Sequence, residues 1–131
     1  MARFFGLAER YDRFRPDYPP AAIEAILAGL PSGAVVADIG AGTGISTRAL
    51  SAAGARAIAI EPNDEMRAFA CASGVDARAG SAENTGLATG SVDVVGCFQA
   101  FHWFANAAPL AEFVRILRPG GRLAIVWNER D

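Results

Sequence analysis

The sequence predicts one α/β domain: a doubly wound, mainly parallel sheet of about five strands with helices on both faces. Three observations favour this fold class. Apolar runs alternate with segments of helical apolar spacing, which is the order of a parallel βα sheet. The 131 residues suffice for one core, and 52% hydrophobic with 20% charged residues is typical of a globular domain. A glycine-rich segment also lies directly between the first apolar run and a helical segment.

Residues 1–20 predict an irregular N-terminal arm, and residues 21–131 predict the core. The arm is rich in aromatic residues and arginine and ends in the turn-prone run Arg15-Pro16-Asp17-Tyr18-Pro19-Pro20. The first helix is predicted over 21–30, because four apolar residues share one helical face: Ile23, Ile26, Leu27 and Leu30.

Strands are predicted over residues 34–39, 56–60, 92–98 and 122–127, which are largely apolar, as expected where a strand is buried on both faces of a sheet. A third strand in chain order, with a weaker apolar pattern, is predicted over 76–79. In such sheets ligands bind at the carboxyl ends of the strands, where the strand order reverses. We therefore expect a site in the loops after Asp38, Ile60, Ala79 and Phe98.

Three further helices are predicted between these strands. Residues 45–53 and 64–72 are each followed by a glycine suited to a left-handed cap, Gly54 or Gly74, and Asn63 is a suitable N-cap. The last helix is expected to end at the Arg-Pro-Gly-Gly run 118–121. Its buried face is expected to contain Leu110, Phe113, Val114 and Leu117.

The segment from Asp38 to Gly44 indicates a ligand site. It follows a strand and opens a helix, and Gly40, Gly42 and Gly44 allow positive φ and close approach of a ligand. A dinucleotide fingerprint would place its third glycine at position 45, which is Ile45 here. This spacing weakens the case for a nicotinamide dinucleotide, and a tight turn without a ligand is the structural alternative. S-adenosylmethionine is a ligand that has no phosphate and needs an acceptor for its ammonium group. Asp38 is placed to help supply that acceptor.

Glu61 ends the second strand, 21 positions after Gly40. In nucleotide-binding βαβ units an acid about 20 residues on reaches the ribose hydroxyls. A solvated glutamate at a strand end is the alternative, but the glycine loop favours the ribose role.

Five separated segments together resemble the class I S-adenosylmethionine-dependent methyltransferases of the small-molecule type. They are Val35 to Gly44, Glu61-Pro62, Gly80 to Glu83, Gln99 to Phe104 and Leu117 to Gly121. The resemblance covers nearly the whole chain from about Tyr11. It implies a Rossmann-like sheet, S-adenosylmethionine as the cofactor and S-adenosylhomocysteine as its product.

The resemblance also implies how the cofactor is bound. The glycine loop, which includes Ala41, would line the methionine part, and Glu61 would bind the ribose. The arm resembles a segment that folds over the cofactor, so Tyr11 is expected to cover the site and Arg15 to pair with the cofactor carboxylate. The residues expected around the adenine and near the methyl group are Pro62, Asn63, Met66, Ser81, Ala82, Glu83, Gln99 and Ala100.

His102 is the one histidine of the chain and a candidate general base. The run Phe101 to Phe104 is better explained as aromatic closure of the pocket. Methyl transfer needs mainly alignment and exclusion of water, so a catalytic residue is not required.

The composition opposes several other classes. A net charge of −2 without long runs of one sign does not favour nucleic-acid binding. No apolar stretch has membrane-spanning length and the N-terminus lacks a signal peptide's apolar centre, so we expect a cytoplasmic protein without a membrane partner. Cys71 and Cys97 lack CxxC spacing, so no metal site is predicted and both thiols are expected to be buried.

The chain ends at Asp131, whereas the family usually continues with a helix and a β-hairpin. We expect this C-terminal hairpin to be absent and the edge of the fifth strand, including Trp127, to be open. The domain would then be either shortened or completed as a homo-oligomer.

Two alternatives to a methyltransferase acting on a small-molecule acceptor stay open. The early end favours a non-catalytic S-adenosylmethionine-binding or interaction module. An NAD(P)-dependent oxidoreductase is less favoured, because Ile45 interrupts its glycine fingerprint and the chain contains no lysine for a Tyr-x-x-x-Lys pair.

Overall fold

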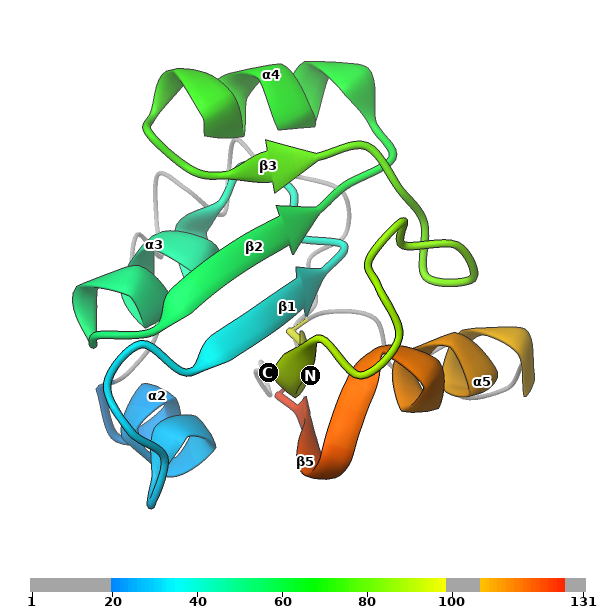
Figure 1. Ribbon diagram of the computed structural model, residues 1–131. Helices are drawn as coiled ribbons and strands as arrows, with labels where there is room; N and C mark the ends of the chain where they lie inside the picture. Colours follow the sequence, from blue (N-terminus) through cyan, green and yellow to red (C-terminus); the bar gives the residue numbers. More distant parts are fainter. Residues whose placement is uncertain (1–19, 99–106, 127–131) are drawn as a thin grey trace, which may run out of the picture.

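The computed structural model describes residues 20–98 and 107–126 as a parallel sheet with helices packed against it (Figure 1). The strands lie in the order β3-β2-β1-β4-β5, and each described pairing is parallel. The order reverses between β1 and β4, which makes the sheet doubly wound. The predicted fold class is confirmed. The strands are β1 (Val35–Ile39), β2 (Arg56–Ile60), β3 (Ala77–Arg78), β4 (Val92–Cys97) and β5 (Leu117–Ile125).

Four helices are described: α2 (Pro20–Leu27), α3 (Ile45–Ala52), α4 (Asp64–Ala72) and α5 (Ala107–Ile116). The predicted caps of α4 are confirmed, because Asn63 Oδ1 accepts from the Met66 N–H at 2.9 Å and Gly74 has a φ of 94°. Gly54, after α3, has a φ of 102°. α2 ends at Leu27, earlier than predicted, in a turn where Gly29 has a φ of 80°. None of these helices, within the residues described, is long and apolar enough to cross a membrane.

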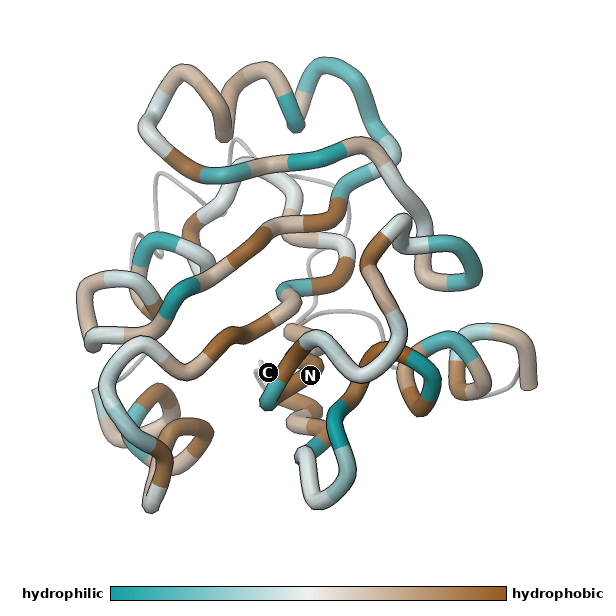
Figure 2. Tube along the Cα trace, viewed as in Figure 1, coloured by the Kyte–Doolittle hydropathy of each residue, from teal (hydrophilic) through white to brown (hydrophobic). Residues whose placement is uncertain are grey.

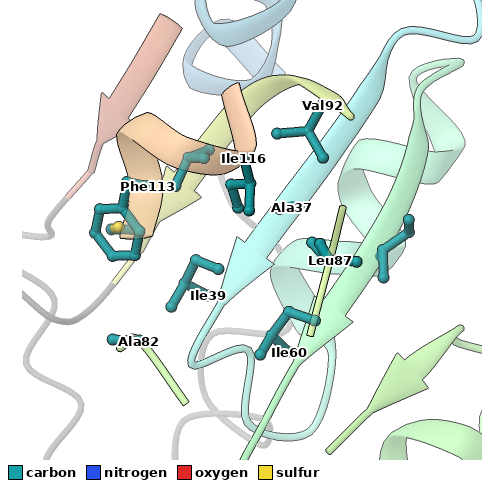
Figure 3. Packing of buried hydrophobic residues seen from close by; sticks show 11 residues of the cluster. Ala37, Ile39, Ile60, Ala82, Leu87, Val92, Phe113 and Ile116 are labelled. Atoms are coloured by element: carbon teal, nitrogen blue, oxygen red, sulfur yellow. The ribbon is translucent and has the colours of Figure 1, made fainter. Parts of the chain in front are cut away.

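The core lies on both faces of the sheet, because successive side chains of a strand point to opposite faces. On β1, Val36 packs with α2 and α3, whereas Ala37 packs with α5 on the other face. Figure 2 shows the apolar residues concentrated along the central strands. The α5 cluster, shown in Figure 3, comprises Ala37, Ile39, Ile58, Ile60, Ala82, Leu87, Val92, Val95, Cys97, Phe113 and Ile116.

Two burial predictions are wrong. Val114 is 71% exposed, and Ile116 is buried instead, because the face of α5 that meets the sheet contains Pro109, Phe113 and Ile116. Spacings of three and four residues keep these side chains on one face, whereas Val114 is one residue round the helix from Phe113. Cys71 is exposed on α4, whose buried residue is the neighbouring Ala70, while Cys97 is buried as expected.

The Arg-Pro-Gly-Gly run 118–121 was predicted to separate the last helix from the last strand. It lies inside β5 instead and interrupts the pairing of β5 with β4. β5 begins at Leu117, directly after α5, and Leu117 pairs with Val92. Regular pairing resumes at Arg122 opposite Val94, so the intervening residues bulge out of the ladder. Leu123 and Ile125 on this edge strand are 37% and 40% exposed. Trp127 lies outside the described residues.

Candidate functional site

The glycine loop lies at the carboxyl end of β1, beside the point where the strand order reverses. Gly40, Gly42 and Gly44 have φ values of 69°, 62° and 92°, a left-handed conformation that favours glycine. The Gly40 N–H donates to the Ile60 carbonyl at 2.7 Å, so the loop is held against the end of β2. A Cβ on Gly42 would lie 3.7 Å from Met66 Sδ, which places α4 beside the loop. Ile45, at the third dinucleotide position, is a buried core residue instead of a glycine.

Glu61 joins this loop to the end of β2. Its Oε1 accepts from the Gly42 N–H at 2.7 Å, and its Oε2 accepts from the Asn63 N–H at 2.9 Å. The side chain is buried, at 6% exposure. A carboxylate has about four acceptor sites, so two backbone donors leave capacity for two hydroxyl groups.

Asp38 is fully buried at the end of β1. Its Oδ2 accepts from Ser46 Oγ and Thr47 Oγ1, both at 2.7 Å, whereas Oδ1 has no hydrogen-bond partner. Burial raises the pKa of Asp38 to about 6, against the lowering effect of the two hydroxyl groups, and the Glu61 charge raises it further. The unpartnered oxygen can accept a hydrogen bond from a ligand cation.

Ser81, Ala82 and Glu83 lie in a turn beyond β3. The Ser81 N–H donates to the Asn84 carbonyl and the Asn84 N–H to the Ser81 carbonyl, both at 3.1 Å. Glu83 is exposed, whereas Ala82 packs into the α5 cluster with Ile60 (Figure 3). The Glu61 N–H donates to the Arg78 carbonyl at 3.0 Å, so the chain leading to this turn runs beside the glutamate.

Some of the predicted site residues lie outside the described residues. These are Tyr11, Arg15, Gln99, Ala100 and His102. Pro62 is exposed at the end of β2, next to Asn63. Within the described part of the chain no group of three or more potential metal ligands occurs.

Two hollows of about 320 and 360 Å³ lie elsewhere, near the amino ends of β1 and β2. Ala34 and Ala55 line the first, and Ala55 and Arg56 line the second. In a doubly wound sheet the ligand site lies at the opposite, carboxyl ends of the strands. We therefore place the candidate site at the glycine loop.

Five polar residues that hold these segments in place were not predicted from the sequence. Ser46 and Thr47 orient Asp38, and Thr85 is bonded to the Glu112–Arg115 ion pair of α5. A signal existed for Glu112, because it is a charged residue on the helix face that also contains Pro109 and Phe113. Which partner it meets could not be predicted without the tertiary structure.

The fold and the site define a class: a Rossmann-like α/β domain with a glycine loop and an acidic strand end at its topological switch point. Comparison with protein families narrows the class, because the methyltransferase domain model matches residues 37–125. The chain belongs to this methyltransferase family.

Similarity to individual proteins supports this assignment. An uncharacterized methyltransferase of Mycobacterium tuberculosis is 44% identical over 135 residues, covering 100% of this chain and 54% of the relative. One of Schizosaccharomyces pombe is 38% identical and covers 92% of this chain and 50% of the relative. The crystal structure of a SAM-dependent methyltransferase of Thermotoga maritima has a TM-score of 0.72 at 29% identity, covering 90% of this chain and 55% of that one. The chain thus spans about half the length of the curated relatives it matches.

If the glycine loop forms part of a ligand site, Gly44→Ala should weaken ligand binding as well as stability. A left-handed φ costs a non-glycine residue about 1–2 kcal/mol, and the new Cβ would lie 3.0 Å from Val75 Cγ2. Gly33→Ala is the matched control, since Gly33 has a φ of 85° but no atom within 4 Å of the new Cβ. Urea denaturation should show destabilisation of both variants. Titration with S-adenosylhomocysteine should show weaker binding for Gly44→Ala alone, and equal affinities would contradict the placement of the loop in the site.

Proposed function

We propose that this chain binds S-adenosylmethionine and forms the cofactor-binding part of a methyltransferase that acts on a small-molecule acceptor. The main support is the direct hydrogen bond between the glycine loop and Glu61, 2.7 Å from the Gly42 nitrogen to Oε1. It joins the segment expected to line the methionine part to the acid expected to bind the ribose. Membership of the methyltransferase family supports the same cofactor.

The described residues fit such a cofactor. Asp38 Oδ1 is a buried acceptor without a partner, suited to the ammonium group. Glu61 retains acceptor capacity for ribose hydroxyls, and Gly40, Gly42 and Gly44 lack the side chains that would obstruct the methionine part. Met66 on α4 and the Ser81–Glu83 turn beyond β3 both follow Glu61 along the chain and are assigned to the adenine.

The cofactor supplies a methyl group on a sulfonium centre. In this proposal the protein's own residues bind and orient the cofactor. No proton transfer is assigned to His102, because methyl transfer to a good nucleophile needs mainly alignment of the acceptor with the methyl group. A net charge of −2 favours a small-molecule acceptor over a nucleic acid. Gln99 and Ala100 are proposed to lie near the methyl group, and Tyr11 and Arg15 over the cofactor.

Calorimetric titration with S-adenosylhomocysteine tests the cofactor. We expect S-adenosylhomocysteine to bind and NADH and NADPH not to bind. Glu61→Ala should weaken binding about tenfold or more, because it removes hydrogen bonds to a charged group. Glu65→Ala, an exposed glutamate in the first turn of α4, is the matched control and should bind as the unmodified chain does.

Binding of NADH instead, or equal affinity of both glutamate variants, would contradict the proposal. If S-adenosylhomocysteine binds as expected, a second assay follows. Methylation of an acceptor in the presence of S-adenosylmethionine would distinguish an enzyme from a non-catalytic binding module.

A further inference from the structure

A network of polar contacts outside the candidate site connects α5 to the loop between β3 and β4. Glu112 Oε2 accepts from the Thr85 N–H at 2.9 Å and from Thr85 Oγ1 at 2.6 Å. Arg115 Nε donates to Glu112 Oε1 at 2.8 Å, and Arg115 Nη2 donates to Oε2 at 2.8 Å. Arg115 Nη2 also reaches the Leu87 carbonyl at 2.7 Å. The loop is therefore fixed to the helix, beside which it passes in Figure 1.

The centre of this network is an ion pair between the Glu112 carboxylate and the Arg115 guanidinium. The Arg115 guanidinium, with smaller contributions from Thr85, lowers the pKa of Glu112 to about 2. Glu112 is 9% exposed, and Thr85 is 2% exposed. A buried hydrogen-bonded carboxylate that accepts two donors from one residue fixes that residue's position more strictly than apolar packing does.

The Thr85 backbone packs against Gly80, the residue directly before the Ser81–Glu83 turn. A Cβ on Gly80 would lie 2.9 Å from the Thr85 carbonyl oxygen and 2.9 Å from Ile60 Cγ2. Gly80 is therefore held between Thr85 and the last residue of β2, directly before Glu61. The turn that follows is closed at both ends by the two hydrogen bonds between Ser81 and Asn84. A shift of Thr85 would thus move the whole turn.

We propose that Glu112 and Arg115 are positioning residues that, through Thr85, hold the Ser81–Glu83 turn against the base of the cofactor and so determine its selectivity for adenine. This inference rests on the proposed function, because the turn faces a base only if S-adenosylmethionine binds at the glycine loop. The network itself does not touch the cofactor. Its role is to keep backbone groups of the turn at the distance that a specific hydrogen bond requires.

The test compares two ligands that differ in the base. S-adenosylhomocysteine carries the 6-amino group of adenine, whereas S-inosylhomocysteine carries a carbonyl at the same position. The unmodified chain should prefer the first by about tenfold or more, since a mismatched base leaves polar groups unpaired. Glu112→Gln places an amide N–H₂ where an acceptor is needed, and the preference should fall towards one.

Two further variants make the result specific. Thr85→Val removes the 2.6 Å hydroxyl contact but keeps the Glu112–Arg115 pair, and should also reduce the preference. This variant decides the question if Glu112→Gln does not fold. Asp93→Asn is the control, because it alters only the contacts of Asp93 with Arg118 and with the Val35 N–H, at the amino ends of β4 and β1. It should keep the preference of the unmodified chain.

The outcomes separate this inference from the proposed function. If S-adenosylhomocysteine does not bind the unmodified chain, the proposed function is wrong and this inference with it. If it binds but the two ligands have equal affinity, or if the folded variants keep the full preference, the cofactor assignment stands and the positioning role is overturned.

Discussion

Asp38→Asn is expected to remove a large pH dependence of stability. Burial raises the pKa of Asp38 to about 6 from an ordinary value of 3.8. The folded chain therefore binds a proton between about pH 4 and pH 6 that the unfolded chain has released. A group of this kind makes the folded state more stable as pH falls through that window, by about 3 kcal/mol for a shift of about two units.

Other acids work in the opposite direction and at lower pH. The pKa values of Glu112 and Asp76 are lowered, mainly by hydrogen bonds to Arg115 and Arg78. Their stabilising effect is complete above the unfolded pKa and is lost as pH falls below about 4.5 towards the folded value. The difference between the unmodified chain and Asp38→Asn isolates the Asp38 contribution. It is measured by urea denaturation from pH 4 to pH 8.

Asp76→Asn is the control. The hydrogen bond to Arg78 lowers the pKa of Asp76, so its contribution lies below this window and the slope between pH 4 and pH 6 should be kept. An unchanged slope in Asp38→Asn would mean that Asp38 is not the group responsible.

The same group should link cofactor binding to pH. If the ammonium of S-adenosylhomocysteine pairs with Asp38, the complex holds the carboxylate ionised, and affinity should fall about tenfold per pH unit below about pH 6. Asp38→Asn should bind more weakly at pH 8 and show a flat profile. A flat profile in the unmodified chain would contradict the pairing.

Phe113→Ala is expected to cause the largest loss of stability. Phe113 is 1% exposed in the α5 cluster, between this helix and the sheet (Figure 3). Truncating a buried phenylalanine removes its transfer free energy and leaves a cavity, at a cost of about 3–5 kcal/mol. This loss is large compared with the free energy of unfolding of a typical domain, which is about 5–15 kcal/mol.

Val114→Ala provides a direct comparison, because Val114 is the next residue and is 71% exposed. Its effect on the free energy of unfolding should be within about 0.5 kcal/mol. Urea denaturation followed by circular dichroism measures both, and Phe113→Leu provides a milder change if the alanine variant does not fold. Equal effects at the two positions would mean that α5 faces the sheet differently.

The sequence by itself determined which segments along the chain form strands and which form helices, since each element follows from local signals. Apolar runs and helical spacing located the elements, and the caps at Asn63, Gly54 and Gly74 arise within a few residues of the helix they limit. The glycine loop and Glu61 were predictable as candidates for the same reason: a parallel sheet brings the carboxyl ends of its strands to one edge.

Only the tertiary structure decided which side chains meet. Val114 and Cys71 were predicted to be buried, but the packing of a helix selects one face among several that periodicity allows, and both are exposed. The start of β5 depends on pairing with β4, which no local pattern records. The contacts of Glu112 with Thr85 and of Asp38 with Ser46 join residues 27 and 8 positions apart. Such contacts depend on the relative placement of whole elements, which is set by how the two faces of the sheet fill with side chains, not by sequence spacing.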